Sequence, residues 1–536
     1  MTQTTLADQP TQAAVAGKPR ADGRWSVRVF AVGILAALPL LLWFGRDHWF
    51  YLDEFQILGA DGLSRTGYLD GHNGHWITLL RLEYRLNFEL WGLRSYLPYQ
   101  VPAVLGHLVS AVLLRQVCRR LGARGWIATA CALAFLFFGT GRENATLGFQ
   151  VSLTASLICG FGMLLLGDGP KAVTRRDWLV LGIGVVGLMT SGVFLAVAVG
   201  FGAATLLRRG LRVAAFYGVP LGAIYLAWYV LYGRDSAFPV RLDGGALSYF
   251  RRMLWAVFDA LAQNGVFGAL LVVVAALGVA AAVLRARRSG DRAVAALPVG
   301  LATAWLTFAI LPSLTRAEAT SAFGFGGRLL HVSAAFVLPL VAAGAEELAR
   351  RRTALGVAAL VPLAVGVPGN LDRLSETSIL FRSDRQLAYA VAHSRYIDDV
   401  PANLRPLQDN GFRPPATAQW LARHAADRRI PEPDEPVPPN VELAATSRLA
   451  LTQVVAESAR PACPALDGPL RLSLREGDEI PFAGAVQVSV TDGEHESFPR
   501  RFLGLDDSAI RAEAGPVDVV VRSIPDAPAS VCPPGD

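Results

Sequence analysis

The chain has 536 residues, of which 52% are hydrophobic and 18% charged, and its mean hydropathy is +0.37. Such values lie far from those of soluble globular proteins and indicate a membrane protein. The net charge of +6 comes mostly from arginines between the apolar runs. It therefore reports topology and contact with anionic lipid, and it gives no indication of nucleic-acid binding.

Apolar runs recur along the chain as far as residue 369. A transmembrane helix needs roughly 17 to 25 residues, and about eleven runs approach that length. They lie at 27–44, 99–117, 125–140, 150–167, 178–190, 191–207, 212–232, 265–284, 293–311, 329–346 and 353–369. The pair within 178–207 is the weakest, because only a short Thr-Ser-Gly turn separates its members.

Basic residues collect in alternate loops between these runs. The clusters are Lys18–Arg28, Arg115–Arg124, Lys171–Arg176, Arg208–Arg212, Arg285–Arg292 and Arg350–Arg352. Because basic residues are retained in the cytoplasm, we expect a multi-pass protein of the cytoplasmic membrane with its N-terminus inside and its C-terminal part outside. The first run has no convincing cleavage site, which favours an uncleaved anchor.

These patterns divide the chain into four parts. We expect a disordered cytoplasmic N-terminus at 1–26 and a transmembrane domain at 27–369, which includes a long exterior loop at 45–98. An exterior helical and proline-rich linker is expected at 370–440. An exterior β-rich domain is expected at 441–536.

The last part shows the alternation of apolar and polar residues that is typical of strands. Runs at 470–474, 486–490 and 517–521 are separated by turn residues and predict a small β-sandwich or mixed domain. Cys463 and Cys532 bracket most of this segment on the oxidising side, so we expect them to form a disulfide. Whether this domain binds sugar or only covers the membrane part stays open.

The exterior loop at 45–98 carries the most chemistry. Asp53 and Glu54 follow the first apolar run, where two adjacent carboxylates are costly to desolvate and have no packing role. They indicate a site that handles an oxygen or a cation. A charged amphipathic stretch at 77–91 is too polar to span the membrane and is expected to lie in its interface.

Two histidines lie between these features. His72 and His75 are either hydrogen-bonded loop residues or contacts to substrate or carboxylate. With Asp53 they also offer the ligand types for a divalent metal such as Mg or Mn, and the leading pair for that role is Asp53 and His75.

Two further loops offer polar groups at the same side of the membrane. Glu143 and Asn144 either join Asp53 in one pocket or leave Glu143 as a surface pair with Arg142. Arg328 follows the glycine-rich stretch 323–327 and either reaches lipid headgroups or binds a phosphate with two parallel hydrogen bonds. The loop at 233–264 adds arginines without a specific spacing.

The acidic pair, the interfacial stretch behind it, the many spans and the exterior C-terminal domain together resemble the GT-C superfamily of polytopic glycosyltransferases over residues 27–369. Short blocks are similar to an actinobacterial membrane group related to that superfamily. These blocks are Tyr51–Glu54, His75–Thr78, Leu93–Tyr99, Arg142–Asn144, Phe149–Gln150 and Gly327–Leu329.

The resemblance implies transfer of a sugar from a polyprenyl-phosphate-linked donor to a glycan or protein acceptor of the cell envelope. It implies a carboxylate base at Asp53, with Glu54 and Glu143 as rivals or as groups that orient the acceptor, and Arg328 at the departing phosphate. The candidate substrate contacts are His72, His75, Asn144, Gln150 and Arg328.

Two other classes of protein share this topology. A transporter or flippase of lipid-linked glycans would keep ionisable residues near the middle of the bilayer, whereas here most acids and histidines lie at the membrane edge. A non-catalytic envelope scaffold would act through its C-terminal domain and would be indifferent to the loss of Asp53.

Overall fold

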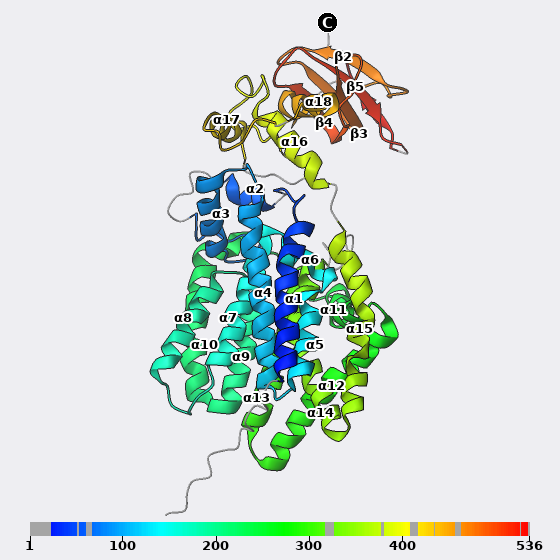
Figure 1. Ribbon diagram of the computed structural model, residues 1–536. Helices are drawn as coiled ribbons and strands as arrows, with labels where there is room; N and C mark the ends of the chain where they lie inside the picture. Colours follow the sequence, from blue (N-terminus) through cyan, green and yellow to red (C-terminus); the bar gives the residue numbers. More distant parts are fainter. Residues whose placement is uncertain are drawn as a thin grey trace, which may run out of the picture.

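The computed structural model describes residues 23–50, 53–59, 67–316, 326–376, 380–407, 416–433, 435–455, 463–525 and 527–533. A long helical bundle carries short helices and an antiparallel sheet at one end, which we call the sheet end (Figure 1). The basic clusters lie at the opposite, arginine-rich end. Tyr51 and Leu52 of the Tyr51–Glu54 block lie outside the described residues, and of the glycine-rich stretch before Arg328 only Gly326 and Gly327 lie within them.

Every predicted span contains a helix. The bundle helices are α1 (Arg24–Phe44), α4 (Leu97–Arg120), α5 (Gly125–Leu136), α7 (Val151–Leu166), α8 (Arg175–Leu188), α9 (Val193–Arg209), α10 (Leu211–Trp228), α12 (Gly265–Ser289), α13 (Ala296–Arg316), α14 (Gly327–Arg351) and α15 (Thr353–Ser375). Eight helices of the described residues are long and apolar enough to cross a membrane, or nine if the bent pair formed by α5 and 139–146 counts as one span. The weakest predicted pair, α8 and α9, has only 14 and 17 residues.

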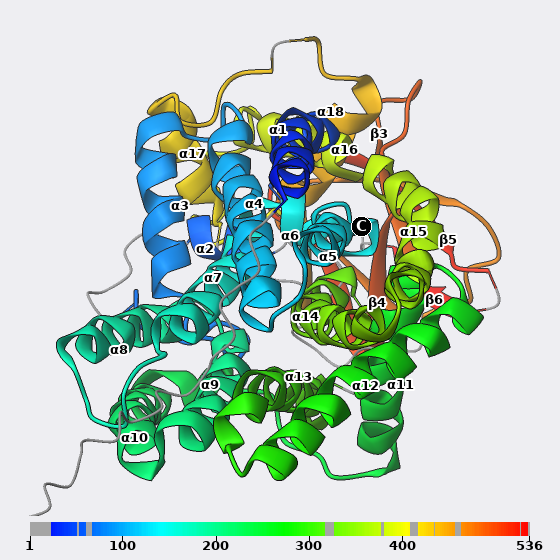
Figure 2. The ribbon, with the colours of Figure 1, turned by 60° about the horizontal axis from the view of Figure 1, so that its bottom comes forward.

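Helix α14 is the centre of the bundle, since 89% of its apolar window is buried. In Figure 2, α8 and α10 lie to one side of it and α11, α12 and α15 to the other. The prediction of a polytopic helical membrane fold is confirmed.

The loop expected at 233–264 contains a helix, α11 (Gly244–Ala262), so that expectation is wrong for most of its length. Asp243 caps this helix by accepting a hydrogen bond from the N–H of Ala246 at 2.8 Å. Its apolar face is buried through Tyr249 and Met253, while Arg251 and Arg252 are exposed. These charges lower the mean hydropathy and hide a helix that packs against α12, α13 and α15.

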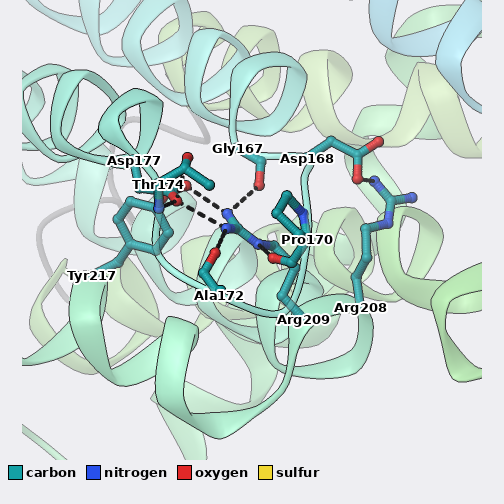
Figure 3. A network of polar contacts seen from close by, with 9 residues as sticks. All are labelled: Gly167, Asp168, Pro170, Ala172, Thr174, Asp177, Arg208, Arg209 and Tyr217. Carbon is teal, nitrogen blue, oxygen red and sulfur yellow. Dashed lines mark hydrogen bonds and ion pairs between the residues drawn. The ribbon is translucent and has the colours of Figure 1, made fainter.

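A buried ion pair ties three helices together at the arginine-rich end (Figure 3). Arg209 of α9 donates to both carboxylate oxygens of Asp177 in α8, at 2.6 and 2.9 Å. It also donates to the carbonyls of the 167–172 loop. Tyr217 of α10 and Thr174 donate to the same carboxylate. The side chains of this network all have their hydrogen-bond partners within it.

The sheet end is built from two parts of the chain that lie far apart in sequence. Helices α2 (Asp53–Leu58) and α3 (Thr78–Trp91) share one apolar core with α16 (Leu380–Ala392), α17 (Ala418–Ala426) and α18 (Pro439–Ala450). In that core the rings of Phe88 and Trp420 stack at 5.5 Å. The N–H of Leu93 donates to the carbonyl of Arg429 at 2.7 Å.

Helix α3 matches the predicted interfacial stretch. It buries Tyr84 and Phe88, while Leu82, Leu86 and Leu90 are 49%, 60% and 65% exposed. These three leucines are spaced by four residues and form one apolar stripe, which suits a helix that rests in the membrane interface.

The C-terminal strands form a single antiparallel sheet in the order β1-β4-β3-β5-β2, with β6 paired to β3. Their bounds are β1 (Leu451–Val455), β2 (Leu470–Leu474), β3 (Glu479–Thr491), β4 (Arg500–Ala512), β5 (Val517–Ser523) and β6 (Ala529–Val531). The sandwich expected from the sequence is therefore one sheet, against which α18 packs. The predicted disulfide between Cys463 and Cys532 is confirmed, with Cα atoms 4.9 Å apart.

Candidate active site

Helix α2 separates the two carboxylates of the acidic pair. Successive residues of a helix are about 100° apart around its axis, so neighbours face different surroundings. Asp53 faces a cavity, whereas Glu54 is 3% exposed and accepts hydrogen bonds from the hydroxyls of Tyr84 and Tyr96, the latter at 2.7 Å. Glu54 therefore anchors the helix that presents Asp53.

The anchor continues into the next loop. The Tyr96 hydroxyl accepts a hydrogen bond from the N–H of Gly148 at 2.9 Å, at the start of the turn that carries Phe149 and Gln150. Glu54 and Tyr96 thus connect the Asp53 helix with the Gln150 turn on the same cavity.

A tight turn presents the two histidines. His72 and His75 exchange backbone hydrogen bonds of 3.0 and 2.8 Å, and Asn73 and Gly74 between them have φ values of 50° and 77°. Two central residues with positive φ define a type I′ turn, for which Asn-Gly is the favoured pair. The histidine side chains are therefore held by a hairpin-like turn.

Each histidine has a definite neighbour. Nε2 of His72 lies 3.7 Å from Oδ1 of Asp53. Nδ1 of His75 accepts the N–H of Gly192 at 3.2 Å, which leaves Nε2 of His75 as the nitrogen that carries the proton. A Cβ on Gly192 would lie only 2.5 Å from that Nδ1, so the close approach requires glycine at this position.

Arg328 stands on the first turn of α14. Its carbonyl accepts a hydrogen bond from Nδ2 of Asn144 at 2.9 Å. The same Nδ2 lies 3.2 Å from Nδ1 of His331, whose Nε2 is 3.0 Å from Nδ1 of His107 in α4. This buried chain fixes the start of α14 and with it the position of Arg328.

One cavity of about 320 Å³ collects these groups. Its polar lining includes Asp53, His72, His75, Gln150 and Arg328. Its other walls are mainly apolar and come from α9, α10, α13 and the 237–240 segment. The apolar and aromatic members include Phe149, Leu195, Tyr225, Tyr229, Phe238, Val240, Phe308, Leu311 and Pro312. A polar head beside an apolar wall suits a ligand that has both characters.

Five predicted site residues therefore meet in this cavity, and three do not. Glu54 is turned into the core beside Tyr84 and Tyr96. Glu143 does not line the cavity, because α6 (Arg142–Thr146) directs its neighbour Asn144 toward α14 instead. Asn144 supports Arg328 from behind, so the expected substrate contact is wrong for it.

The alternative of a surface pair between Arg142 and Glu143 is not observed either. Arg142 pairs with the carboxylate of Glu376 at 3.0 Å and donates to the carbonyl of Arg373 at 3.0 Å. This contact joins α6 to the end of α15.

Burial shifts the titration of two groups next to the site. Desolvation lowers the pKa of His48 to about 4, and Arg142 adds to the effect, against the hydrogen bond that Nδ1 of His48 donates to the carbonyl of Thr146. Burial, and then the nearby Glu54, raises the pKa of Glu83 to about 8. At neutral pH His48 is uncharged, and Glu83 is largely protonated.

The part of the chain that the structure describes holds no group of three or more His, Cys, Asp or Glu residues arranged to bind a metal ion. Of the predicted metal pair, Asp53 offers a carboxylate, whereas His75 has Nδ1 on the Gly192 N–H and a proton on Nε2 and so offers no nitrogen to a metal ion in this arrangement. A divalent ion there would take its other ligands from substrate and water, which is usual for magnesium.

The aromatic wall of the cavity and the buried chain of Asn144, His331 and His107 were not predicted from the sequence. The turn between His72 and His75 could have been predicted, because Asn73-Gly74 is its sequence signal. Tyr225, Tyr229 and Phe308 lie inside apolar runs, where their role in a cavity depends on which helix faces which. His107 is likewise concealed within a span.

No family model matches the chain, and no curated protein matches it in sequence. Two solved structures of ArnT from Cupriavidus metallidurans are similar in fold. The structure bound to undecaprenyl phosphate has a TM-score of 0.46 and 15% identity, over 74% of this chain and 85% of ArnT. The apo structure has a TM-score of 0.42 and 16% identity, over 74% and 84%.

Proposed function

We propose that this protein is a membrane glycosyltransferase that moves a sugar from a polyprenyl-phosphate-linked donor to a cell-envelope acceptor, with Asp53 as the base. The observation that carries the proposal is the cavity in which Asp53, His72, His75 and Arg328 share one polar end beside an apolar wall. The sugar and phosphate of such a donor are polar, and its polyprenyl chain is apolar.

The chemistry follows from the charges at the polar end. Asp53 takes the proton of an acceptor hydroxyl, and the resulting oxygen forms a bond to the anomeric carbon of the donor. The bond between that carbon and the phosphate oxygen breaks, and its electron pair leaves with the polyprenyl phosphate. Arg328 offsets the negative charge that grows on this phosphate, for which its planar fork of donors is well suited.

The histidines orient the reacting groups. His72 contacts the Asp53 carboxylate, and we assign to His75 a hydrogen bond from its protonated Nε2 to a donor or acceptor oxygen. Gln150, which is 4% exposed on the same cavity, adds an amide that can both donate and accept. A divalent ion beside the Asp53 carboxylate would supply further positive charge near the phosphate.

We further propose that the cavity opens on the exterior of the cytoplasmic membrane. The basic clusters lie at the opposite end of the bundle (Figure 1), as expected for a cytoplasmic end. The disulfide between Cys463 and Cys532 belongs to the sheet end, and disulfides persist on the oxidising side. Both observations support the same orientation.

The test uses the purified full-length protein in lipid vesicles, with radiolabelled polyprenyl-phosphate sugars and cell-envelope acceptors. We expect transfer by the wild type, and Asp53→Asn should lower kcat by about 10²- to 10⁴-fold. Glu143→Gln is the matched control at the same end and outside the cavity, and it should stay within about twofold of the wild type. Adding a chelator before the donor tests whether transfer requires a divalent metal ion.

Transfer that survives in Asp53→Asn but fails in Glu54→Gln or Glu143→Gln would reassign the base. If no donor gives label transfer and the envelope sugars of a deletion strain are unaltered, the proposal that this protein is a glycosyltransferase is rejected. Movement of labelled lipid across the bilayer without transfer would instead support the transporter.

A further inference from the structure

A second polar cavity of about 370 Å³ lies at the sheet end, between the bundle and the C-terminal domain. Three segments line it: the residues that follow α1, one face of α16, and the proline-rich stretch before α18. Arg46, Asp47 and Trp49 come from the first segment, Arg385 and Gln386 from the second, and Glu435 from the third. None of the residues assigned above to sugar transfer belongs to it.

The charges of this cavity are balanced. Arg46, Arg385, Asp47 and Glu435 all line it, so two formal positive charges accompany two negative ones. An anion such as phosphate would meet both carboxylates as well as both arginines. The lining therefore favours an uncharged ligand that can both donate and accept many hydrogen bonds.

Trp49 supplies the independent sign of a ligand. It lines the cavity and is 2% exposed, and its indole N–H has no hydrogen-bond acceptor among the described residues. A buried donor without an acceptor is costly to the fold, so such a group points to a partner that arrives from outside the chain. The ring of Trp49 packs edge-on against Tyr389 at 5.3 Å, and the guanidinium of Arg385 lies 5.8 Å from its centre.

A planar amide, planar charged groups and an unpartnered indole N–H around one polar cavity suit a sugar ring. Its hydroxyls exchange hydrogen bonds with the amide, carboxylates and guanidinium groups, and one of them accepts the indole N–H of Trp49. We propose that this second cavity is a saccharide-binding site that holds a non-reacting unit of the acceptor glycan. This assignment rests on the proposed function, since it takes the acceptor to be a glycan.

The two cavities are joined by a short structural path. Trp49 and Asp53 lie four positions apart in one segment of the chain. The ring of His48 lies 6.3 Å from that of Tyr96, and the Tyr96 hydroxyl donates to Glu54 next to Asp53. A glycan unit held beside Trp49 would therefore place the following part of the chain near the base, and its binding energy would position the reacting hydroxyl.

The experiment measures binding by the full-length protein in lipid nanodiscs. The probes are fluorescently labelled di- to hexasaccharides of arabinose, galactose, glucose and mannose. We expect at least one series to bind, and Trp49→Phe should weaken its Kd about five- to tenfold, the worth of one hydrogen bond. Trp420→Phe is the matched control, because Trp420 is 4% exposed and also has an unpartnered indole N–H, but lies outside this cavity.

A transfer assay separates this site from the reacting one. Trp49→Phe should raise the KM for the acceptor by a similar factor and leave kcat within about twofold, because the lost contact is made equally before and in the transition state. Asp53→Asn should keep saccharide binding while transfer is lost. Saccharide binding that depends on Trp49 in a protein without transferase activity would reject the proposed function and retain the site.

The site is overturned if no saccharide of the panel binds, or if Trp49→Phe binds as tightly as the wild type. It is also overturned if inorganic phosphate or phosphatidylglycerol vesicles displace the bound saccharide, because the cavity would then be an anion site. Equal weakening in Trp420→Phe would show a general loss of structure and would likewise reject it.

Discussion

Two places in this molecule bring an aspartate and an arginine to one site, and they do so in opposite ways. At the arginine-rich end Asp177 and Arg209 are 2% exposed and bind each other directly (Figure 3). At the sheet end Asp53 and Arg328 line a cavity, and the carboxylate of Asp53 is 27% exposed. The same residue types are thus enclosed in one place and open in the other.

The difference lies in what satisfies the charges. Arg209 donates hydrogen bonds to Asp177 and to three backbone carbonyls, so its donors are occupied within the fold. Arg328 is held through its backbone carbonyl by Asn144, which leaves the guanidinium to line the cavity. Removing one partner of the closed pair leaves a buried charge uncompensated, whereas the open pair, Asp53 and Arg328, is placed to act on a substrate.

The largest effect should come from opening the closed pair. Asp177→Asn leaves the Arg209 charge buried without a counter-charge, which should lower the free energy of unfolding by about 3–5 kcal/mol. Unfolding in mixed micelles, followed by circular dichroism, measures the loss. Transfer per folded molecule should not change, because the network lies at the other end of the bundle.

Arg208→Gln is the control for this change. Arg208 immediately precedes Arg209 in α9 and pairs with Asp168 at 3.3 Å, but both of these side chains are partly exposed. Its loss should cost about 1 kcal/mol or less. Equal destabilisation by both variants would show that burial does not distinguish the two pairs.

The second effect concerns the open pair. Arg328→Gln removes the positive charge at the departing phosphate and should lower kcat by about 10²- to 10³-fold, without loss of stability. Single-turnover transfer measures it. Arg142→Gln serves as the control, because Arg142 is occupied by Glu376 outside the cavity. If an Arg328 variant binds donor and turns over normally, the proposed role of Arg328 at the departing phosphate is rejected.

Much of this comparison was open to prediction from the sequence. The apolar runs defined the helices, and Asp53, Glu143, His75 and Arg328 were expected to line one cavity, of which Glu143 lies outside the cavity observed. The sequence could not choose between Asp53 and Glu54, because that choice depends on the roll of α2 against Tyr84 and Tyr96. The role of Asn144 depended in the same way on contacts between helices distant in sequence.

Helix α11 and the single sheet escaped prediction for another reason. The charges on α11 break the apolar pattern used to recognise spans, although its 3.6-residue periodicity is present. The strand pattern gives the number of faces that each strand buries, but not whether a helix or a second sheet covers them. Here α18 packs against the sheet.

A smaller effect should follow from loosening the support of Arg328. Asn144→Ala removes the hydrogen bond to the Arg328 carbonyl and should lower kcat about tenfold, with little change in the KM of the donor. The double variant Asn144→Ala with Arg328→Gln should be no slower than Arg328→Gln alone, because the support acts through that side chain. Additive losses in this cycle would show that Asn144 contributes independently.

A further effect should appear in the pH dependence of stability. The pKa of Glu83 is raised to about 8 in the fold, first by burial and then by Glu54, from an ordinary value of 4.5. Between these two values the unfolded chain loses the proton and the folded protein keeps it, so stability should fall as the pH rises from about 5 to 8 and then level off. Glu83→Gln cannot ionise, and its melting temperature should lack this decline, whereas Glu442→Gln, at an exposed position on α18, should melt as the wild type does at each pH. A decline that persists in Glu83→Gln would place the titrating group elsewhere and would show that the carboxylates behind Asp53 are not held in a dry core.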